Sequence, residues 1–109
     1  MGYSRNFELV LECDLTVEAR GLIMDHLKSS YGEADIALTR DGDTYESCRW
    51  YSYDKDMKSF SVMYPNVFFI LEGKGEENGD AWRNYYQDGK GQRCEARYVY
   101  PDYKENLMV

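Results

Sequence analysis

The chain has 109 residues, 43% of them apolar and 30% charged, which is typical of one globular domain spanning residues 1–109 and leaves no room for a second core. Its 20 acidic and 13 basic residues give a net charge of −7, which disfavours direct nucleic-acid binding because neutralised phosphates supply most of that affinity. Such a charge keeps a small protein soluble, and it also attracts proteins whose own sites are basic.

The chain shows neither a leader nor a cysteine framework. Its first residues lack the run of about seven apolar side chains of a signal peptide, and no stretch approaches the roughly 18 of a membrane helix. Cys13, Cys48 and Cys94 are odd in number and lack a CxxC spacing, which predicts reduced thiols and no zinc site. We therefore expect a cytoplasmic protein with no cofactor and no membrane contact.

The first part of the chain predicts a strand followed by a helix. In FELVLEC, residues 7–13, apolar and polar side chains alternate, as in a strand with one buried face. Thr16 can cap a helix over residues 17–30, and Gly32 offers a left-handed stop for it.

A hairpin and a second helix are predicted next. Strands over residues 34–40 and 44–52 flank Asp41-Gly42, a dipeptide that accepts the positive φ angles of a tight turn. Asp54 can then cap a helix that ends before Pro65. The positions that share one face of this helix are Met57, Phe60, Ser61 and Tyr64.

The remaining segments predict three more strands. Residues 67–71, VFFIL, are apolar on both faces, which indicates an internal strand. Residues 81–87 and 92–100 form a second hairpin across 88–91. The complete order predicts an α+β fold, a ferredoxin-like βαββαβ antiparallel sheet with two helices on one face and a C-terminal β-hairpin extension. In that order the first and third strands lie in the middle of the sheet.

The segment GKGEENGD, residues 73–80, joins two predicted strands. A phosphate cradle would need a helix after its glycines, and the carboxylates of this segment repel phosphate. The carboxylates also lack the alternating spacing of an EF-hand, although a looser calcium site on oxygen ligands stays open. A solvated acidic loop is the favoured interpretation.

Catalytic groups are hard to assemble from this sequence. His26 is the only histidine and comes one position before an apolar residue of its helix, so we expect it to border the core or solvent. No local signature pairs it with a cysteine. We therefore expect a non-enzymatic protein without catalytic residues.

Residues 50–90 resemble a known family. The pattern consists of Trp50, Phe60-Ser61 and Tyr64-Pro65, then VFFILEGKGEE, then Asp80-x-Trp82 and Gly89-Lys90. It is similar to that of the YubB ferredoxin-like family of small proteins from phages, plasmids and bacteria, although Arg49-Trp50-Tyr51-Ser52 stands in place of the family's Gly-Thr-Lys-Trp-like segment. The resemblance implies a ferredoxin-like fold and a mobile-element origin, and it brings no catalytic residues.

Charge and resemblance together predict an inhibitor. We expect a non-enzymatic acidic protein from a phage or mobile element that blocks a basic, nucleic-acid-handling site of a host defence complex, as anti-CRISPR proteins do. Its partner would be a basic host protein or ribonucleoprotein complex in the host cell cytosol, and a homodimer is also open. The expected contacts are carboxylates and aromatic anchors, namely Glu72, Glu76, Glu77, Asp80, Asp41, Asp43, Asp54, Asp56, Trp82, Tyr51, Tyr53 and Tyr85.

A second hypothesis uses the sheet face away from the helices. Aromatic and basic residues alternate along the predicted strands, as on platforms that bind single-stranded nucleic acid or small ligands. They are Tyr45, Arg49, Tyr51, Tyr53, Arg83, Tyr85, Arg93 and Arg97. Glutamates interleave with them, so cross-strand ion pairs or a protein interface explain the same residues at lower electrostatic cost.

Overall fold

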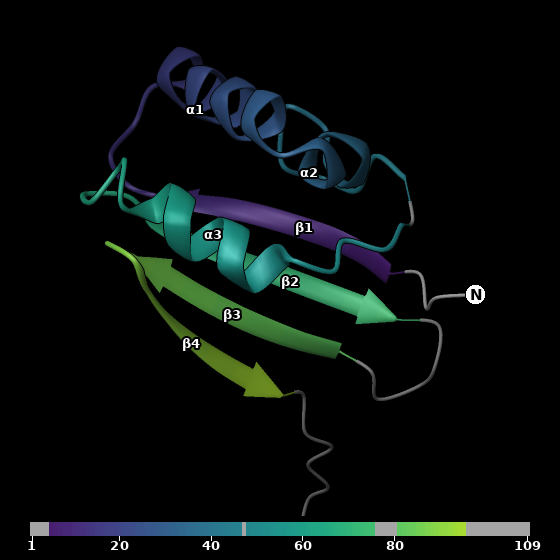
Figure 1. Ribbon diagram of the computed structural model, residues 1–109. Helices are drawn as coiled ribbons and strands as arrows, with labels where there is room; N and C mark the ends of the chain where they lie inside the picture. The colour runs from purple at the N-terminus through teal and green to yellow at the C-terminus, as the bar shows by residue number, and fades with distance from the viewer. Residues whose placement is uncertain (1–4, 47, 76–80, 96–109) are drawn as a thin grey trace, which may run out of the picture.

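The computed structural model describes residues 5–46, 48–75 and 81–95 (Figure 1). The elements follow the order β1 (Arg5–Glu12), α1 (Val17–Ser30), α2 (Gly32–Ala37), α3 (Tyr53–Ser61), β2 (Phe68–Gly75), β3 (Ala81–Gln87) and β4 (Lys90–Glu95). The strands form one antiparallel sheet in the order β1-β2-β3-β4, and the helices lie on one of its faces. The predicted α+β class is therefore confirmed. None of the helices in the described part of the chain is long and apolar enough to cross a membrane.

Alternation along the strands divides the sheet into a helix-facing side and an open side. Successive residues of a strand point to opposite faces, so each strand contributes to both sides. The helix-facing side carries the buried residues Phe7, Leu9, Leu11, Phe69, Leu71, Trp82, Asn84 and Tyr86. The open side carries residues that are at least partly exposed, namely Glu8, Val10, Ile70, Glu72, Arg83, Tyr85 and Cys94.

Helix α1 has the bounds that the sequence predicts. The Thr16 hydroxyl accepts a hydrogen bond from the Ala19 N–H at 3.1 Å, which satisfies one of the free donors of the first turn. Ile23, Met24 and Leu27 are buried against the sheet. The predicted stop at Gly32 is wrong, because the helix ends on the extended backbone of Tyr31 (φ −133°, ψ 109°) and Gly32 begins α2.

The predicted strand over residues 34–40 is wrong, because this segment begins as helix α2. Ala34 and Ala37, three positions apart, are both fully buried, and alanine has the highest helix propensity. The strand over 44–52 is also absent; an isolated bridge between Leu38 and Thr44 is what remains of this hairpin in the described residues. The ferredoxin-like order is therefore not confirmed, and β1 lies at an edge of the sheet instead of in its middle.

Residues 38–44, which we call the edge loop, cover the outer edge of β1. The Leu9 N–H donates a hydrogen bond to the Gly42 C=O at 2.8 Å, and the Thr44 hydroxyl donates to the Phe7 C=O at 2.7 Å. The Arg20 guanidinium donates to the Leu11 C=O farther along the strand. An uncovered edge strand invites pairing with other chains, so these contacts protect β1 from it.

The C-terminal half follows the sequence more closely. β2 is internal, as its doubly apolar pattern predicts, and α3 buries Met57, Phe60 and Ser61. The predicted cap at Asp54 is wrong, because α3 begins at Tyr53. The strand over residues 81–87 is confirmed as β3.

The second hairpin turns more tightly than predicted. Asp88 and Gly89 form a two-residue turn with φ angles of 48° and 81°, so β4 begins at Lys90. The predicted continuation of this strand beyond residue 95 lies outside the described residues.

The edge loop makes Gly42 a sensitive position. A Cβ atom there would lie 2.1 Å from the Leu9 carbonyl oxygen, and the φ of +92° is strained for any other residue. We expect Gly42→Ala to lower the free energy of unfolding by about 2–4 kcal/mol, measured by urea denaturation.

Gly32→Ala is the matched control. No atom lies within 4 Å of a Cβ at Gly32, and the residue already has helical backbone, so stability should stay unchanged or rise slightly. Similar losses in the two variants would contradict the close contact between the edge loop and β1.

Candidate functional site

The edge loop brings three carboxylates together beside β1. Glu8 lies on β1, and Asp41 and Asp43 flank Gly42, which is bonded to Leu9. All three side chains are exposed and line one groove of about 200 Å³. We call Glu8, Asp41 and Asp43 the β1-edge carboxylates.

Two arginines line the same groove, and both contact other groups of the fold. Arg20 donates to the carbonyl oxygens of Leu11 and Cys13, and Arg40 pairs with Asp25 at 3.0 Å. The β1-edge carboxylates make no ion pair with another described residue. Their side chains are exposed, and carboxylate oxygens accept charge-assisted hydrogen bonds from basic side chains.

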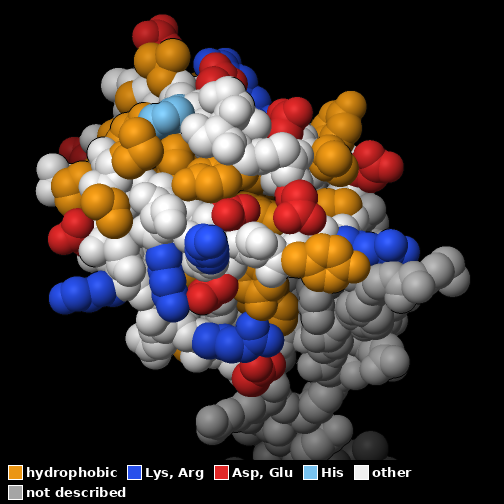
Figure 2. Space-filling view, in the orientation of Figure 1, with side chains coloured by type: hydrophobic (Ala, Val, Ile, Leu, Met, Phe, Trp, Pro, Cys, Tyr) orange, Lys and Arg blue, Asp and Glu red, His pale blue; other side chains and the backbone are white. Residues whose placement is uncertain are grey.

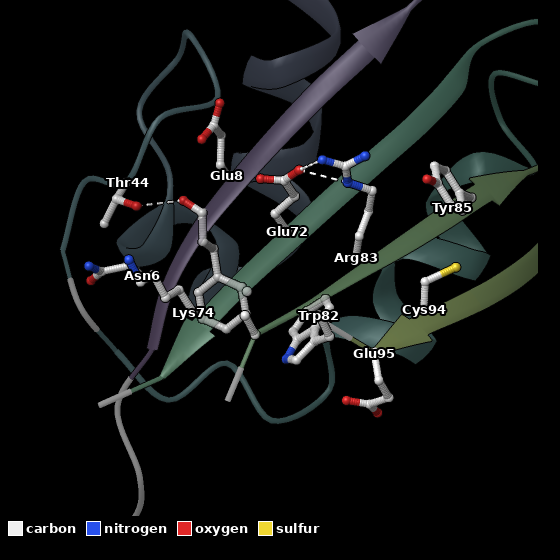
Figure 3. A pocket seen from close by; sticks show the side chains of 13 residues that line it. Asn6, Glu8, Thr44, Glu72, Lys74, Trp82, Arg83, Tyr85, Cys94 and Glu95 are labelled. Carbon is white, nitrogen blue, oxygen red and sulfur yellow. Dashed lines mark hydrogen bonds and ion pairs between the residues drawn. The ribbon is translucent and has the colours of Figure 1, made fainter. Parts of the chain in front are cut away.

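A second hollow, of about 470 Å³, lies mainly on the open side of the sheet, where β1 begins and β2 ends (Figure 3). Here the Arg83 guanidinium donates to Glu72 Oε1 from the adjacent strand, with an Nε–Oε1 distance of 2.7 Å. The Tyr85 ring also lines this hollow and stacks on Phe68, with 5.5 Å between ring centroids. Glu72 is thus already in an ion pair with Arg83, so its carboxylate is less available to a basic partner.

Two of the predicted contact carboxylates hold α3 against the core. Asp54 Oδ1 accepts the Tyr86 hydroxyl at 3.0 Å, and its other oxygen pairs with Lys58 at 3.0 Å. Asp56 Oδ2 accepts the indole N–H of buried Trp50 at 2.9 Å. These carboxylates therefore have structural roles, although 52% of the Asp54 side chain remains exposed.

The predicted aromatic anchors are separated by the fold. Trp82 is only 3% exposed and stacks on Tyr53 with 4.4 Å between ring centroids, so its indole is not accessible to a partner. Arg93 covers the same pair, donating to the Tyr53 hydroxyl at 2.6 Å. Tyr51, by contrast, is 69% exposed and lies outside the sheet. The predicted contacts Glu76, Glu77 and Asp80 lie outside the described residues.

The aromatic and basic platform is not assembled on the open side. Arg83 and Tyr85 lie there, whereas Tyr53 and Arg93 contact Trp82 on the helix-facing side. The other members precede α3 or lie outside the described residues, namely Tyr45, Arg49, Tyr51 and Arg97. Stacking of successive bases needs neighbouring rings on one face, which these positions do not supply.

Asn84 and Tyr86 form a polar pair inside the core. The Asn84 amide donates to the Tyr86 hydroxyl oxygen at 2.7 Å, and that hydroxyl donates to Asp54. Burial raises the pKa of Tyr86, and Asp54 raises it further, while the hydrogen bond from Asn84 opposes the shift. The hydroxyl therefore stays protonated and serves as the donor that links β3 to α3.

The groups considered for catalysis are integrated into the fold. His26 Nδ1 lies 2.8 Å from the Tyr64 hydroxyl, and its ring packs on buried Phe60, so the half-buried imidazole lies at the border of the core. Figure 2 shows this pale blue side chain among hydrophobic ones. Burial raises the pKa of the Cys48 thiol, as do two nearby glutamates. In the described segments, no three His, Cys, Asp or Glu side chains gather as metal ligands do.

The sequence pointed to Asp41 and Asp43 but not to Glu8. Glu8 lies more than 30 positions away in the chain, and its alternation with apolar neighbours shows only that it faces away from the core. The missing information was that the edge loop bonds to β1 instead of forming a hairpin of its own.

Comparisons with protein-family models, with curated proteins and with solved structures find no match. The resemblance to the YubB family therefore stays a prediction, and the geometry described above carries the functional argument.

Replacement of Tyr86 by Phe tests the polar pair. The variant should lower the free energy of unfolding by about 1–3 kcal/mol at pH 7, because Asn84 loses a buried partner and Asp54 loses a donor. Urea denaturation of the variant and the wild type measures this difference. Tyr51→Phe, at an exposed position, should leave stability unchanged.

The same variant tests the raised pKa of Tyr86. Because the unfolded chain releases this proton first, near pH 10, the contribution of Tyr86 is complete below that pH and is lost as the pH rises toward the folded pKa. Between about pH 10 and 11, the wild type should lose up to roughly 1.4 kcal/mol more than Tyr86→Phe. Identical pH profiles for the two proteins would contradict the shift.

Proposed function

We propose that this chain is a non-enzymatic acidic protein that binds a basic, nucleic-acid-handling site on a partner protein and blocks it. The observation that carries the proposal is the set of β1-edge carboxylates, which are exposed, line one groove and make no ion pair with other described residues. The net charge of −7 adds a long-range attraction toward such a site.

The chemistry of the two surfaces is complementary. Sites that handle nucleic acid present lysines and arginines to phosphate oxygens, and carboxylate oxygens accept the same charge-assisted hydrogen bonds. The Leu9–Gly42 hydrogen bond holds Asp41 and Asp43 at a fixed place beside Glu8, so less conformational freedom is lost on binding. Exposed Tyr51 supplies an aromatic anchor of the kind found in protein interfaces.

The biological context that we propose for this inhibitor rests on the sequence. The acidic charge and the resemblance to the YubB family support a phage or mobile-element inhibitor of a host defence complex, in the manner of an anti-CRISPR protein. Its partner would be a basic host protein or ribonucleoprotein complex in the host cytosol. Glu76, Glu77 and Asp80 remain further proposed contacts.

A second candidate function is binding of a small ligand in the hollow of the open side. Its volume of about 470 Å³ lies within the range of ligand sites, and Tyr85 offers an aromatic wall. The Glu72–Arg83 pair would have to open for a charged ligand to bind these two side chains, which ranks this candidate second.

Capture from a nuclease-treated bacterial lysate tests the first function. Asp41→Asn/Asp43→Asn should reduce the recovery of basic nucleic-acid-binding proteins by about tenfold, since two charge-assisted contacts are lost. Raising the salt from about 0.05 to 0.5 M should release the same proteins from the wild type. Quantitative mass spectrometry measures both effects.

Glu46→Lys is the matched control, because it changes the net charge by the same amount at an exposed residue that makes no ion pair in the described part of the chain. It should retain capture to within about twofold, because Glu46 does not line the groove of the β1-edge carboxylates. Equal losses in the two variants, or capture insensitive to both variants and to salt, would contradict a role for the β1-edge carboxylates.

A further inference from the structure

The two edge strands of the sheet, β1 and β4, differ in what covers their outer backbone groups. At β1, the edge loop and Arg20 engage the outward-facing backbone groups of Phe7, Leu9 and Leu11. At the other edge, no helix or strand of the described residues lies beyond β4 (Figure 1). β4 is therefore the edge at which the sheet can accept a further strand.

The hairpin turn determines which backbone groups of β4 face outward. In a hairpin with a two-residue turn, the flanking residues Gln87 and Lys90 bond to each other, so alternate residues of β4 bond to β3. The groups of Gly91, Arg93 and Glu95 then face away from the sheet. Backbone groups alternate in the same way along β3, β2 and β1. Followed through the registers of these strands, the alternation directs the Leu9 N–H away from the sheet, which agrees with its hydrogen bond to the Gly42 C=O.

We propose that β4 pairs with β4 of a second copy of this chain, antiparallel about a two-fold axis, so that one sheet continues through both copies. A two-fold interface requires a self-complementary surface, and the outward residues of β4 include one basic and one acidic side chain. The proposal concerns assembly and does not depend on the function of the β1-edge carboxylates.

Charge favours the register that pairs the two charged residues of β4 with each other. With Arg93 opposite Glu95 of the second copy, the two-fold axis creates the same cross-strand ion pair twice. The neighbouring registers place Arg93 opposite Arg93, or Glu95 opposite Glu95, and are disfavoured by repulsion. Within one chain Arg93 already donates to Glu95 at 2.6 Å, so in the dimer each arginine lies beside two carboxylates.

This register has a chemical signature. It places Cys94 directly opposite Cys94 of the second copy, in a pair that shares no backbone hydrogen bonds with the opposite strand. Such pairs have Cα atoms about 4.5 Å apart, which lies within the range of a disulfide. Cys94 is a half-buried free thiol on the open side, beside the hollow of Figure 3.

Cross-linking and sedimentation test the pairing on the full chain. Cys13→Ser/Cys48→Ser, which keeps only Cys94, should form a covalent dimer with diamide, which takes up the two hydrogens released as the S–S bond forms. Cys94→Ser should not cross-link at a comparable rate. Sedimentation of the reduced wild type should show a monomer–dimer equilibrium over a range of concentrations.

Charge exchange tests the register. Glu95→Arg places arginines opposite each other twice and should weaken dimerisation by about tenfold. Arg93→Glu/Glu95→Arg restores opposite charges and should recover the affinity to within about threefold. Thermal unfolding of each variant shows whether the monomer is still folded, since Arg93 also contacts Tyr53.

Hydrogen exchange in the wild type shows whether a second copy or residues of the same chain cover the outer edge of β4. The amides of Arg93 and Glu95 should become more protected as the protein concentration rises. Protection that does not depend on concentration, in a chain that sediments as a monomer, would show that residues of the same chain cover this edge and would overturn the proposal. A dimer that fails to cross-link through Cys94 would overturn it as well.

Discussion

The hydrogen bond between the Leu9 N–H and the Gly42 C=O is the contact on which the arrangement of this molecule depends. It joins the edge loop to β1, and the loop in turn covers an edge strand that would otherwise expose a row of unpaired backbone groups. Only a glycine fits so close to the Leu9 carbonyl with a φ of +92°. One contact therefore ends the sheet on this side and fixes the neighbours of Gly42 beside Glu8.

The fold gives its acidic residues different roles. Asp54 and Asp56 accept hydrogen bonds from Tyr86 and Trp50 and thereby hold α3 on the core. The β1-edge carboxylates are exposed and make no such contact with the residues that the structure describes. A net charge of −7 therefore indicates the kind of partner, whereas the position of each carboxylate decides which of them can reach it.

The sequence predicted the elements whose signals are local. Helix α1 has both a cap at Thr16 and a helical spacing of apolar residues, and β3 shows clear alternation. Residues 34–40 were misassigned because a short apolar segment fits both the helical and the strand periodicity. In the structure, Ala34 and Ala37 are buried on one face of helix α2. The roles of Trp82 and Glu8 depend on which face the helices cover and where the edge loop lies, and both are tertiary relations that no local pattern contains.

The central claim is that the edge loop is bonded to β1, and amide hydrogen exchange of Leu9 tests it most directly. Leu9 and Leu11 both direct their N–H groups away from β2, but among the described residues only that of Leu9 has an acceptor, the Gly42 C=O. The account predicts slow exchange at Leu9 and much faster exchange at Leu11. Equally fast exchange at both amides would show that the loop is not held on the strand and would contradict the account.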